Sequence, residues 1–143
     1  MPKIQDILSK IPHVDPYRFI DDILEVDECH IVGKFCLRPD SFFYRGHFPQ
    51  NPLTPGFIIS EIMAQIGILG LGLYLTRDYT TSIQYAVLTS ADIKFYNVSY
   101  PNDTIQVRSR KIYFRFKKIK CEIEAFNQKG DLLCSGSMTG MIG

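Results

Sequence analysis

A histidine and a glutamate, fourteen residues apart, are the two side chains of this sequence best suited to acid–base chemistry. His47 lies in the stretch RGHFPQNPLTPG, and Glu61 interrupts an apolar run that continues through ILGLGLYL. A neutral imidazole can act as a general base, and a carboxyl group kept protonated by apolar surroundings can act as a general acid. Such a pair suits removal of a proton beside a carbonyl with loss of a β-hydroxyl as water, which is a dehydration.

The residues just before Glu61 have the composition of a helix N-terminus. Thr54 is expected to cap the helix with its hydroxyl, and Pro55 to occupy the first helical position. The N–H groups of Gly56 and Phe57 would then lack a partner inside the helix and would form a positive end suited to a polarised carbonyl. Because Gly56 has no Cβ, a ligand could approach its N–H closely.

The helix that follows is predicted to be apolar nearly all round. Residues 57–75 are about long enough to cross a bilayer, but Ser60, Glu61 and Gln65 favour a helix buried in a protein core instead. Gln65 shares a face with Glu61, so we expect it to orient the carboxyl, with plain helix packing as the alternative. A proline-rich loop separates His47 from this helix, so the two groups meet either within one chain or across a dimer interface.

Strand patterns account for most of the remaining chain. A short helix over residues 3–10 precedes two predicted strands, 20–26 and 31–38, and a loop over residues 39–55 leads into the long helix. After that helix every segment is predicted as strand. The cleanest example alternates apolar with charged positions, its apolar members being Ile119, Cys121, Ile123 and Ala125.

One of the later strands changes phase along its length. Ile105 and Val107 place odd positions inward, whereas Ile112, Phe114 and Phe116 place even positions inward, which predicts a bulge or sharp bend. A bent antiparallel sheet beside one very apolar helix predicts an α+β domain in which the sheet wraps the helix. At 143 residues the chain is expected to form one domain, residues 1–143.

Composition excludes some broad functions. A formal net charge of +1 gives no general attraction to nucleic acid or to an anionic membrane. The four cysteines have neither CxxC spacing nor scaffold density, and the start MPKIQDILSK lacks a signal-peptide core, so we expect a reduced, cytoplasmic protein. His13 and His30 are expected to be structural or exposed. No metal site is expected, because neither histidine has ligand spacing to a cysteine.

The sequence resembles the FabZ-type 3-hydroxyacyl-[acyl-carrier-protein] dehydratases of type II fatty-acid synthesis, in the hot-dog superfamily. IPHVDPYRFIDDILEVD resembles the family's opening LPHRYPFLLVDRVLEVE. FYRGHFPQNPLTPGFIISEIMAQ resembles FFxGHFPGxPVMPGVLxIEAMAQ with the same spacing of histidine and acid, and IKFYNVSYPNDTI is similar to a KFRRPVVPGDQL-like stretch. The resemblance covers most of the chain and implies a hot-dog fold.

This resemblance implies roles for individual residues. His47 would take the C2 proton of a 3-hydroxyacyl thioester, Glu61 of a partner subunit would help the C3 hydroxyl leave, and the Gly56 N–H would polarise the thioester carbonyl. The acyl chain would contact Phe48, Phe57, Ile58 and Gln65. The implied assembly is a homodimer with composite sites or a trimer of such dimers, and no cofactor is implied beyond the phosphopantetheine arm of acyl carrier protein.

Several features leave the substrate and the function open. Gln50 and Thr54 stand where the family has Gly and Met, and Arg18 interrupts an apolar stretch, which affects the chain length accepted and the pathway served. A hot-dog acyl thioesterase and a non-catalytic acyl-binding subunit are the alternative functions. A cluster of bases including Arg108, Arg110 and Lys111 predicts either a solvated sheet face or a docking site for acidic acyl carrier protein.

Overall fold

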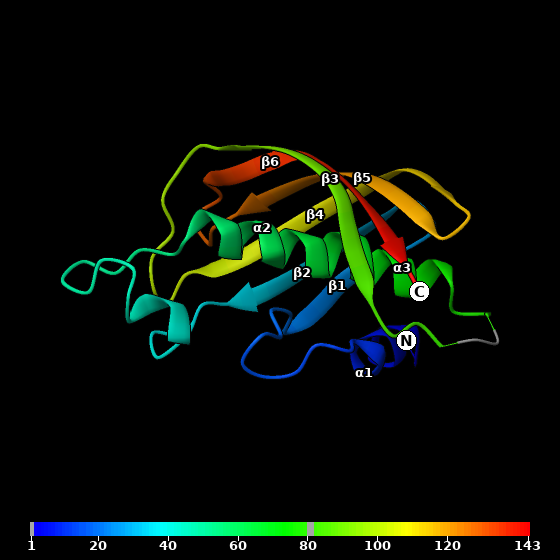
Figure 1. Ribbon diagram of the computed structural model, residues 1–143, viewed down its shortest axis with the longest axis horizontal. Coiled ribbons are helices and arrows are strands. Elements are labelled where there is room, and N and C mark those ends of the chain that lie inside the picture. Colours follow the sequence, from blue (N-terminus) through cyan, green and yellow to red (C-terminus); the bar gives the residue numbers. More distant parts are fainter. Residues whose placement is uncertain (1, 80–81) are drawn as a thin grey trace.

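A single six-stranded antiparallel sheet curls around one long helix in the computed structural model, which describes residues 2–79 and 82–143 (Figure 1). The strand order is β1-β2-β4-β5-β6-β3, so β1 and β3 form the two edges. The strands are β1 (Asp22–Val26), β2 (His30–Cys36), β3 (Ala86–Phe95), β4 (Thr104–Arg115), β5 (Lys118–Phe126) and β6 (Leu132–Ile142). The predicted α+β class is confirmed.

The central helix is continuous but changes its winding halfway. It consists of α2 (Gly56–Ala64), a π-helical segment η2 (Gln65–Gly70) and α3 (Leu71–Leu75). By length and composition these 20 residues could cross a membrane, but 78% of the most apolar window is buried inside the protein. The helix is therefore the centre of the core, as its all-round apolar character predicted.

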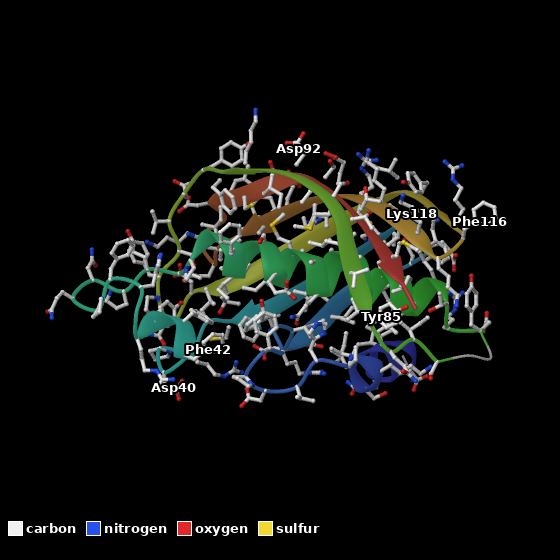
Figure 2. The ribbon with its side chains drawn as sticks, viewed as in Figure 1. Asp40, Phe42, Tyr85, Asp92, Phe116 and Lys118 are labelled. Atoms are coloured by element: carbon white, nitrogen blue, oxygen red, sulfur yellow. The ribbon has the colours of Figure 1, made fainter. Side chains whose placement is uncertain are left out.

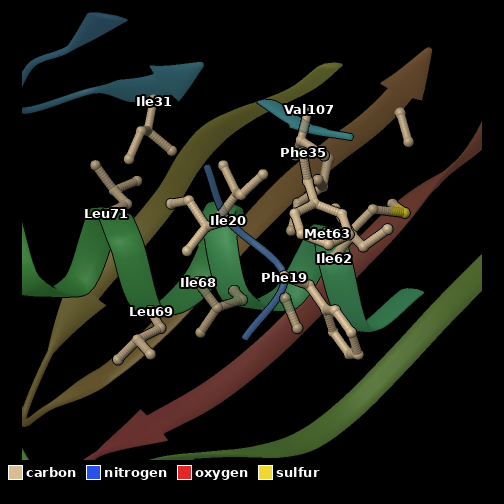
Figure 3. Packing of buried hydrophobic residues seen from close by; sticks show 14 of the residues in the cluster. Phe19, Ile20, Ile31, Phe35, Ile62, Met63, Ile68, Leu69, Leu71 and Val107 are labelled. Carbon is tan, nitrogen blue, oxygen red and sulfur yellow. The ribbon is translucent and has the colours of Figure 1, made fainter. Parts of the chain in front are cut away.

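The core lies between this helix and the concave face of the sheet (Figure 3). Helix residues such as Ile62, Met63 and Ile66 are fully buried against sheet residues such as Val107 and Ile123. The helix also approaches the strands closely. The Gly67 carbonyl accepts a hydrogen bond from Ser109 Oγ at 3.0 Å, and a Cβ built on Gly67 would meet Ile123 Cδ1 at 2.8 Å.

The shorter elements agree broadly with the sequence predictions. Helix α1 (Pro2–Lys10) and strands β1 and β2 lie where expected, and a 3₁₀ turn, η1 (Phe42–Tyr44), forms within the loop before α2. Strand β5 buries the four alternating residues predicted, and β6 follows after a turn. The expectation that every segment after the helix is strand is wrong for residues 76–79, 82–85 and 96–103, which are turns and loops that connect the elements. Residues 80 and 81, on which the same expectation falls, lie outside the described part of the chain.

The phase change in β4 is confirmed as a register irregularity between Lys111 and Tyr113, but its expected consequence is partly wrong. Ile112 is exposed at the irregularity, and only Phe114 of the even positions packs against the core. Phe116 lies in the turn to β5 with φ 52° and is 93% exposed, pointing away from the body of the protein at the hairpin tip (Figure 2). The alternation therefore ends at the turn rather than continuing inward.

Strand β3 is an edge strand with little cover on either face. Among the strands of the described residues it pairs with β6 alone, and none of its ten residues is buried. Its exposed side chains include Val87, Leu88 and Phe95. An unpaired edge that also exposes apolar side chains is a surface on which a second chain can pair.

Candidate active site

Glu61 is held by a glutamine one helical turn further along the central helix. Gln65 is 1% exposed, and its Nε2 donates to Glu61 Oε2 at 2.9 Å and to the Tyr17 carbonyl at 3.0 Å. Its Oε1 accepts the Phe19 N–H at 2.7 Å. Both the oxygen and the nitrogen of this buried amide therefore have hydrogen-bond partners, as buried polar groups require. Through them the helix face that carries Glu61 is bonded to the segment before β1.

Glu61 opens onto a pocket of about 220 Å³ between the central helix and β3. The pocket is lined by His13, Glu61, Ala64, Gln65, Ile68, Leu69, Ala86, Val87 and Leu88. The Glu61 side chain is 25% exposed, so it is partly buried and still accessible to solvent in the single chain. Burial, followed by the negative charge of Glu61, raises the pKa of the Tyr17 hydroxyl, which places Tyr17 in the same electrostatic neighbourhood.

His47 lies in the loop between η1 and α2 and is oriented by a main-chain contact. Its Nδ1 is 2.9 Å from the Leu53 carbonyl oxygen, which can only accept, so Nδ1 donates the hydrogen. In the neutral ring Nε2 then carries the lone pair, which is the tautomer a general base requires. The neighbouring Phe48 has φ 61°, and its ring lies 4.5 Å from the imidazole. His47 does not line the Glu61 pocket of its own chain.

The start of α2 differs from the prediction in its capping. Pro55 occupies the N-cap position, and its carbonyl accepts the first helical bonds, from Ile58 and Ile59. The Thr54 hydroxyl does not cap the helix, because it lies 2.6 Å from the Tyr44 hydroxyl in a buried hydrogen bond. Gly56 nevertheless stands at the first helical position, ahead of the first intrahelical donor, as the oxyanion-type role requires.

The remaining predicted substrate contacts are not gathered around one cavity in a single chain. Phe57 is 86% exposed and Phe48 is also exposed, whereas Ile58 is buried in the core. Phe95 of β3 covers the helix start, since a Cβ on Gly56 would lie 3.0 Å from its ring. Of the four predicted substrate contacts, only Gln65 lines the pocket that contains Glu61.

The basic residues of β4 have acidic neighbours that the linear sequence hides. The register pairs Arg108 with Glu124 and Arg110 with Glu122, so each arginine lies across from an acid on β5. Lys111 is opposite Cys121 instead. Within residues 2–79 and 82–143, no group of three or more His, Cys, Asp or Glu side chains could hold a metal ion.

His13 is the residue near the site that sequence reasoning missed. Its Nε2 lies 4.0 Å from Glu61 Oε2, and it lines the same pocket. The PH pair in IPHVDPYRF was available as a signal, but nothing in its spacing pointed to Glu61, which is 48 residues away. Only the packing of residues 11–21 against the central helix brings the two together.

Comparison with known proteins identifies the family. Residues 11–132 match the family model described as a FabA-like domain. The FabZ 3-hydroxyacyl-[acyl-carrier-protein] dehydratase of Fusobacterium nucleatum is 36% identical over 123 residues, covering 82% of this chain and 83% of that protein. The FabZ enzyme of Oleidesulfovibrio alaskensis is 28% identical over 144 residues, covering 97% of this chain and 90% of that protein.

Solved structures support the same fold at low identity. The dehydratase heterocomplex ApeI:P from Xenorhabdus doucetiae matches with TM-score 0.79 and 15% identity, over 96% of this chain and 90% of that chain. A hypothetical thioesterase from Streptococcus pneumoniae, solved with coenzyme A, matches with TM-score 0.63 and 16% identity, over 85% and 84%. The chain has the hot-dog fold and belongs to the FabA-like family, as a relative of the FabZ-type dehydratases.

Proposed function

We propose that this protein dehydrates a 3-hydroxyacyl thioester carried on acyl carrier protein to the trans-2-enoyl thioester, in fatty-acid biosynthesis or a related specialised lipid, polyene or polyketide pathway. The observation that carries the proposal is the state of the two key side chains. His47 is held as the tautomer with a lone pair on Nε2, and Glu61 is oriented by a buried glutamine. The curated relatives named above are dehydratases of this kind.

The reaction divides between these groups. His47 Nε2 takes the C2 proton, the C3–O bond breaks as the C2=C3 double bond forms, and Glu61 gives a proton to the departing hydroxyl, which leaves as water. The Gly56 N–H at the start of α2 stabilises the negative charge that develops on the thioester oxygen. These steps need acid–base groups alone, so we expect no cofactor beyond the phosphopantetheine arm.

We further propose that the working unit is a homodimer in which each site combines His47 of one chain with Glu61 of the other. The Glu61 pocket opens beside β3, an edge strand with exposed apolar side chains, and His47 of the same chain does not line that pocket. Pairing of two β3 edges would cover these side chains and bring a second loop toward the pocket. Phe48 and Phe57, exposed in one chain, would then be available to line an acyl channel. A trimer of such dimers is an alternative assembly.

The partner of the enzyme would be an acidic acyl carrier protein in the cytoplasm, and Arg108, Arg110 and Lys111 are the proposed docking residues. The positive charge of these side chains supports this role, since clusters of cations steer acidic partners. The acids opposite the two arginines reduce the local excess of positive charge, which the design of the test must take into account.

Mass spectrometry of a 3-hydroxyacyl carrier protein after incubation with the enzyme tests the function. Loss of one water from the acyl group is the expected result, and His47→Ala and Glu61→Ala should each lower the rate about 10²–10⁴-fold. Release of free thiol from an acyl thioester, without loss of water, would instead support a thioesterase. This alternative is included because the hypothetical thioesterase from S. pneumoniae has the same fold. No change in either substrate would support a non-catalytic acyl-binding subunit.

A further inference from the structure

We propose that His13 is a positioning residue for Glu61, the general acid. His13 and Gln65 both donate to Oε2 of Glu61, and this keeps the transferable proton on Oε1. The inference rests on the proposed dehydration. It starts from a cluster of three side chains around one pocket, contributed by the segment before β1 and by the central helix.

His13 lies beside the carboxyl group of Glu61. Its Nε2 lies 4.0 Å from Glu61 Oε2, and the two side chains are comparably shielded, at 26% and 25% exposure. This separation is about 1 Å longer than a hydrogen bond, a gap that a small side-chain rotation or one bridging water closes.

The surroundings of the His13 ring determine its tautomer. Its Nδ1 is buried and has no hydrogen-bond partner among the described residues. A buried N–H without an acceptor is rarer in proteins than a buried acceptor without a donor, so the lone pair belongs on Nδ1 and the hydrogen on Nε2. That hydrogen is on the nitrogen nearest to Glu61.

The two oxygens of the Glu61 carboxyl have different surroundings. Gln65 Nε2 already donates to Oε2, and His13 Nε2 approaches the same oxygen. An oxygen that receives two N–H donors is the carbonyl oxygen of a carboxylic acid, because the hydroxyl oxygen is the poorer acceptor and carries its own hydrogen. The proton is thereby directed to Oε1. Once it has left, the same donors stabilise the carboxylate.

Paired substitutions of His13 test the proposal in the full-length enzyme. His13→Leu removes the N–H and should lower kcat about tenfold to a hundredfold, the effect of one hydrogen bond to a charged group, with KM within about twofold. His13→Gln keeps an N–H donor and should recover most of that loss. His30→Leu is the matched control, since His30 also contacts two carboxylates, Glu25 and Asp27, but outside this pocket, and its kcat should be unchanged.

The thermal midpoint of each variant separates positioning from a general structural role. A wild-type kcat in His13→Leu would overturn the inference while leaving the dehydration intact, and so would equal losses of kcat in the Leu and Gln variants that follow equal losses of stability. ¹⁵N-histidine NMR of the wild type gives an independent answer: His13 should be protonated at Nε2, and protonation at Nδ1 alone would contradict the proposal. A wild type that releases no water from the acyl substrate would contradict the proposed function itself.

Discussion

Gln65 Nε2 donates to Glu61 Oε2 at 2.9 Å, while Gln65 Oε1 accepts the Phe19 N–H at 2.7 Å. A single buried amide therefore ties the acid on the central helix to the segment that leads into the first strand. The contact makes the geometry of Glu61 depend on the packing of residues 11–21 as well as on the helix.

Gln65→Leu should therefore impair both stability and activity. The change leaves the buried Phe19 N–H without its acceptor, at about 1–3 kcal/mol. It also removes a donor from the partly buried Tyr17 carbonyl and frees the Glu61 carboxyl. Urea unfolding and the dehydration assay measure the two effects. Gln128→Leu is the control, because the exposed Gln128 also bridges two groups, the Thr104 N–H and Asp103 Oδ1, but away from the Glu61 pocket. It should keep its activity and lose about 1 kcal/mol, the ordinary value for a hydrogen bond. Equal activity in the two variants would contradict the orienting role.

Gly67→Ala should destabilise the fold although alanine is the better helix former. The new Cβ would meet Ile123 Cδ1 at 2.8 Å and Ser109 Cβ at 3.0 Å, so we expect a net loss of about 1–3 kcal/mol from overpacking. Gly46→Ala has nothing within 4 Å of its added Cβ and should change the free energy of unfolding by about 0.5 kcal/mol or less. Chemical denaturation of both variants provides the comparison, and an unchanged or higher stability of Gly67→Ala would show that the helix can move away from the sheet.

The two buried cysteines predict loss of stability at high pH. Burial raises the pKa of Cys121 from 9.0 to about 11 and that of Cys134 to about 12. Between about pH 9 and these values the unfolded thiols lose protons that the folded ones retain, so the free energy of unfolding should fall as the pH rises. Cys121→Ala/Cys134→Ala should reduce this slope. At pH 8, iodoacetamide should label the exposed Cys29 in the folded protein and reach Cys121 and Cys134 only after unfolding, as followed by mass spectrometry.

Charge reversal on β4 tests carrier-protein docking, provided that the cross-strand acids are considered. Arg108→Glu should raise KM for a carrier-bound substrate while sparing a small thioester mimic, but it also places two acids opposite each other. Arg108→Glu combined with Glu124→Arg restores an opposite-charge pair. If docking depends on the position of the arginine, KM stays high in the exchanged pair. A KM that returns to the wild-type value, or an equal effect on the mimic, would assign Arg108 to strand pairing instead.

Much of this fold was predictable because its pattern signals are local. The alternation in β5 and the all-round apolar helix lead directly to a sheet wrapped around a core helix, and both are present. The π-helical segment has no signal in the local sequence pattern. Within it the Gly67 carbonyl accepts hydrogen bonds from Ser109 of β4 and Cys121 of β5, which are contacts between elements distant in sequence. The expected Thr54 cap was wrong for a similar reason, since the hydroxyl has a tertiary partner in Tyr44.

The site was predictable where residue type and helical spacing decide it, as for Glu61 and Gln65. His13 was missed because Glu61, its neighbour on the helix, is distant in sequence. The acids opposite Arg108 and Arg110 could not be predicted, because the register between two strands cannot be deduced from the sequence of one strand. Both omissions concern contacts between elements, which a periodicity in one segment cannot specify.

Complementation between inactive subunits tests the composite site most directly. His47→Ala and Glu61→Ala chains with different affinity tags are coexpressed, and the mixed assemblies are isolated through both tags. Each mixed dimer should hold one intact site and recover about a quarter to a half of the wild-type rate of dehydration.

The control is a mixed dimer of wild type with the double variant His47→Ala/Glu61→Ala, which leaves no intact composite site and should be inactive. The opposite pattern, inactive mixed dimers of the single variants and a half-active control, would contradict the account, because it requires His47 and Glu61 of the same chain to act together.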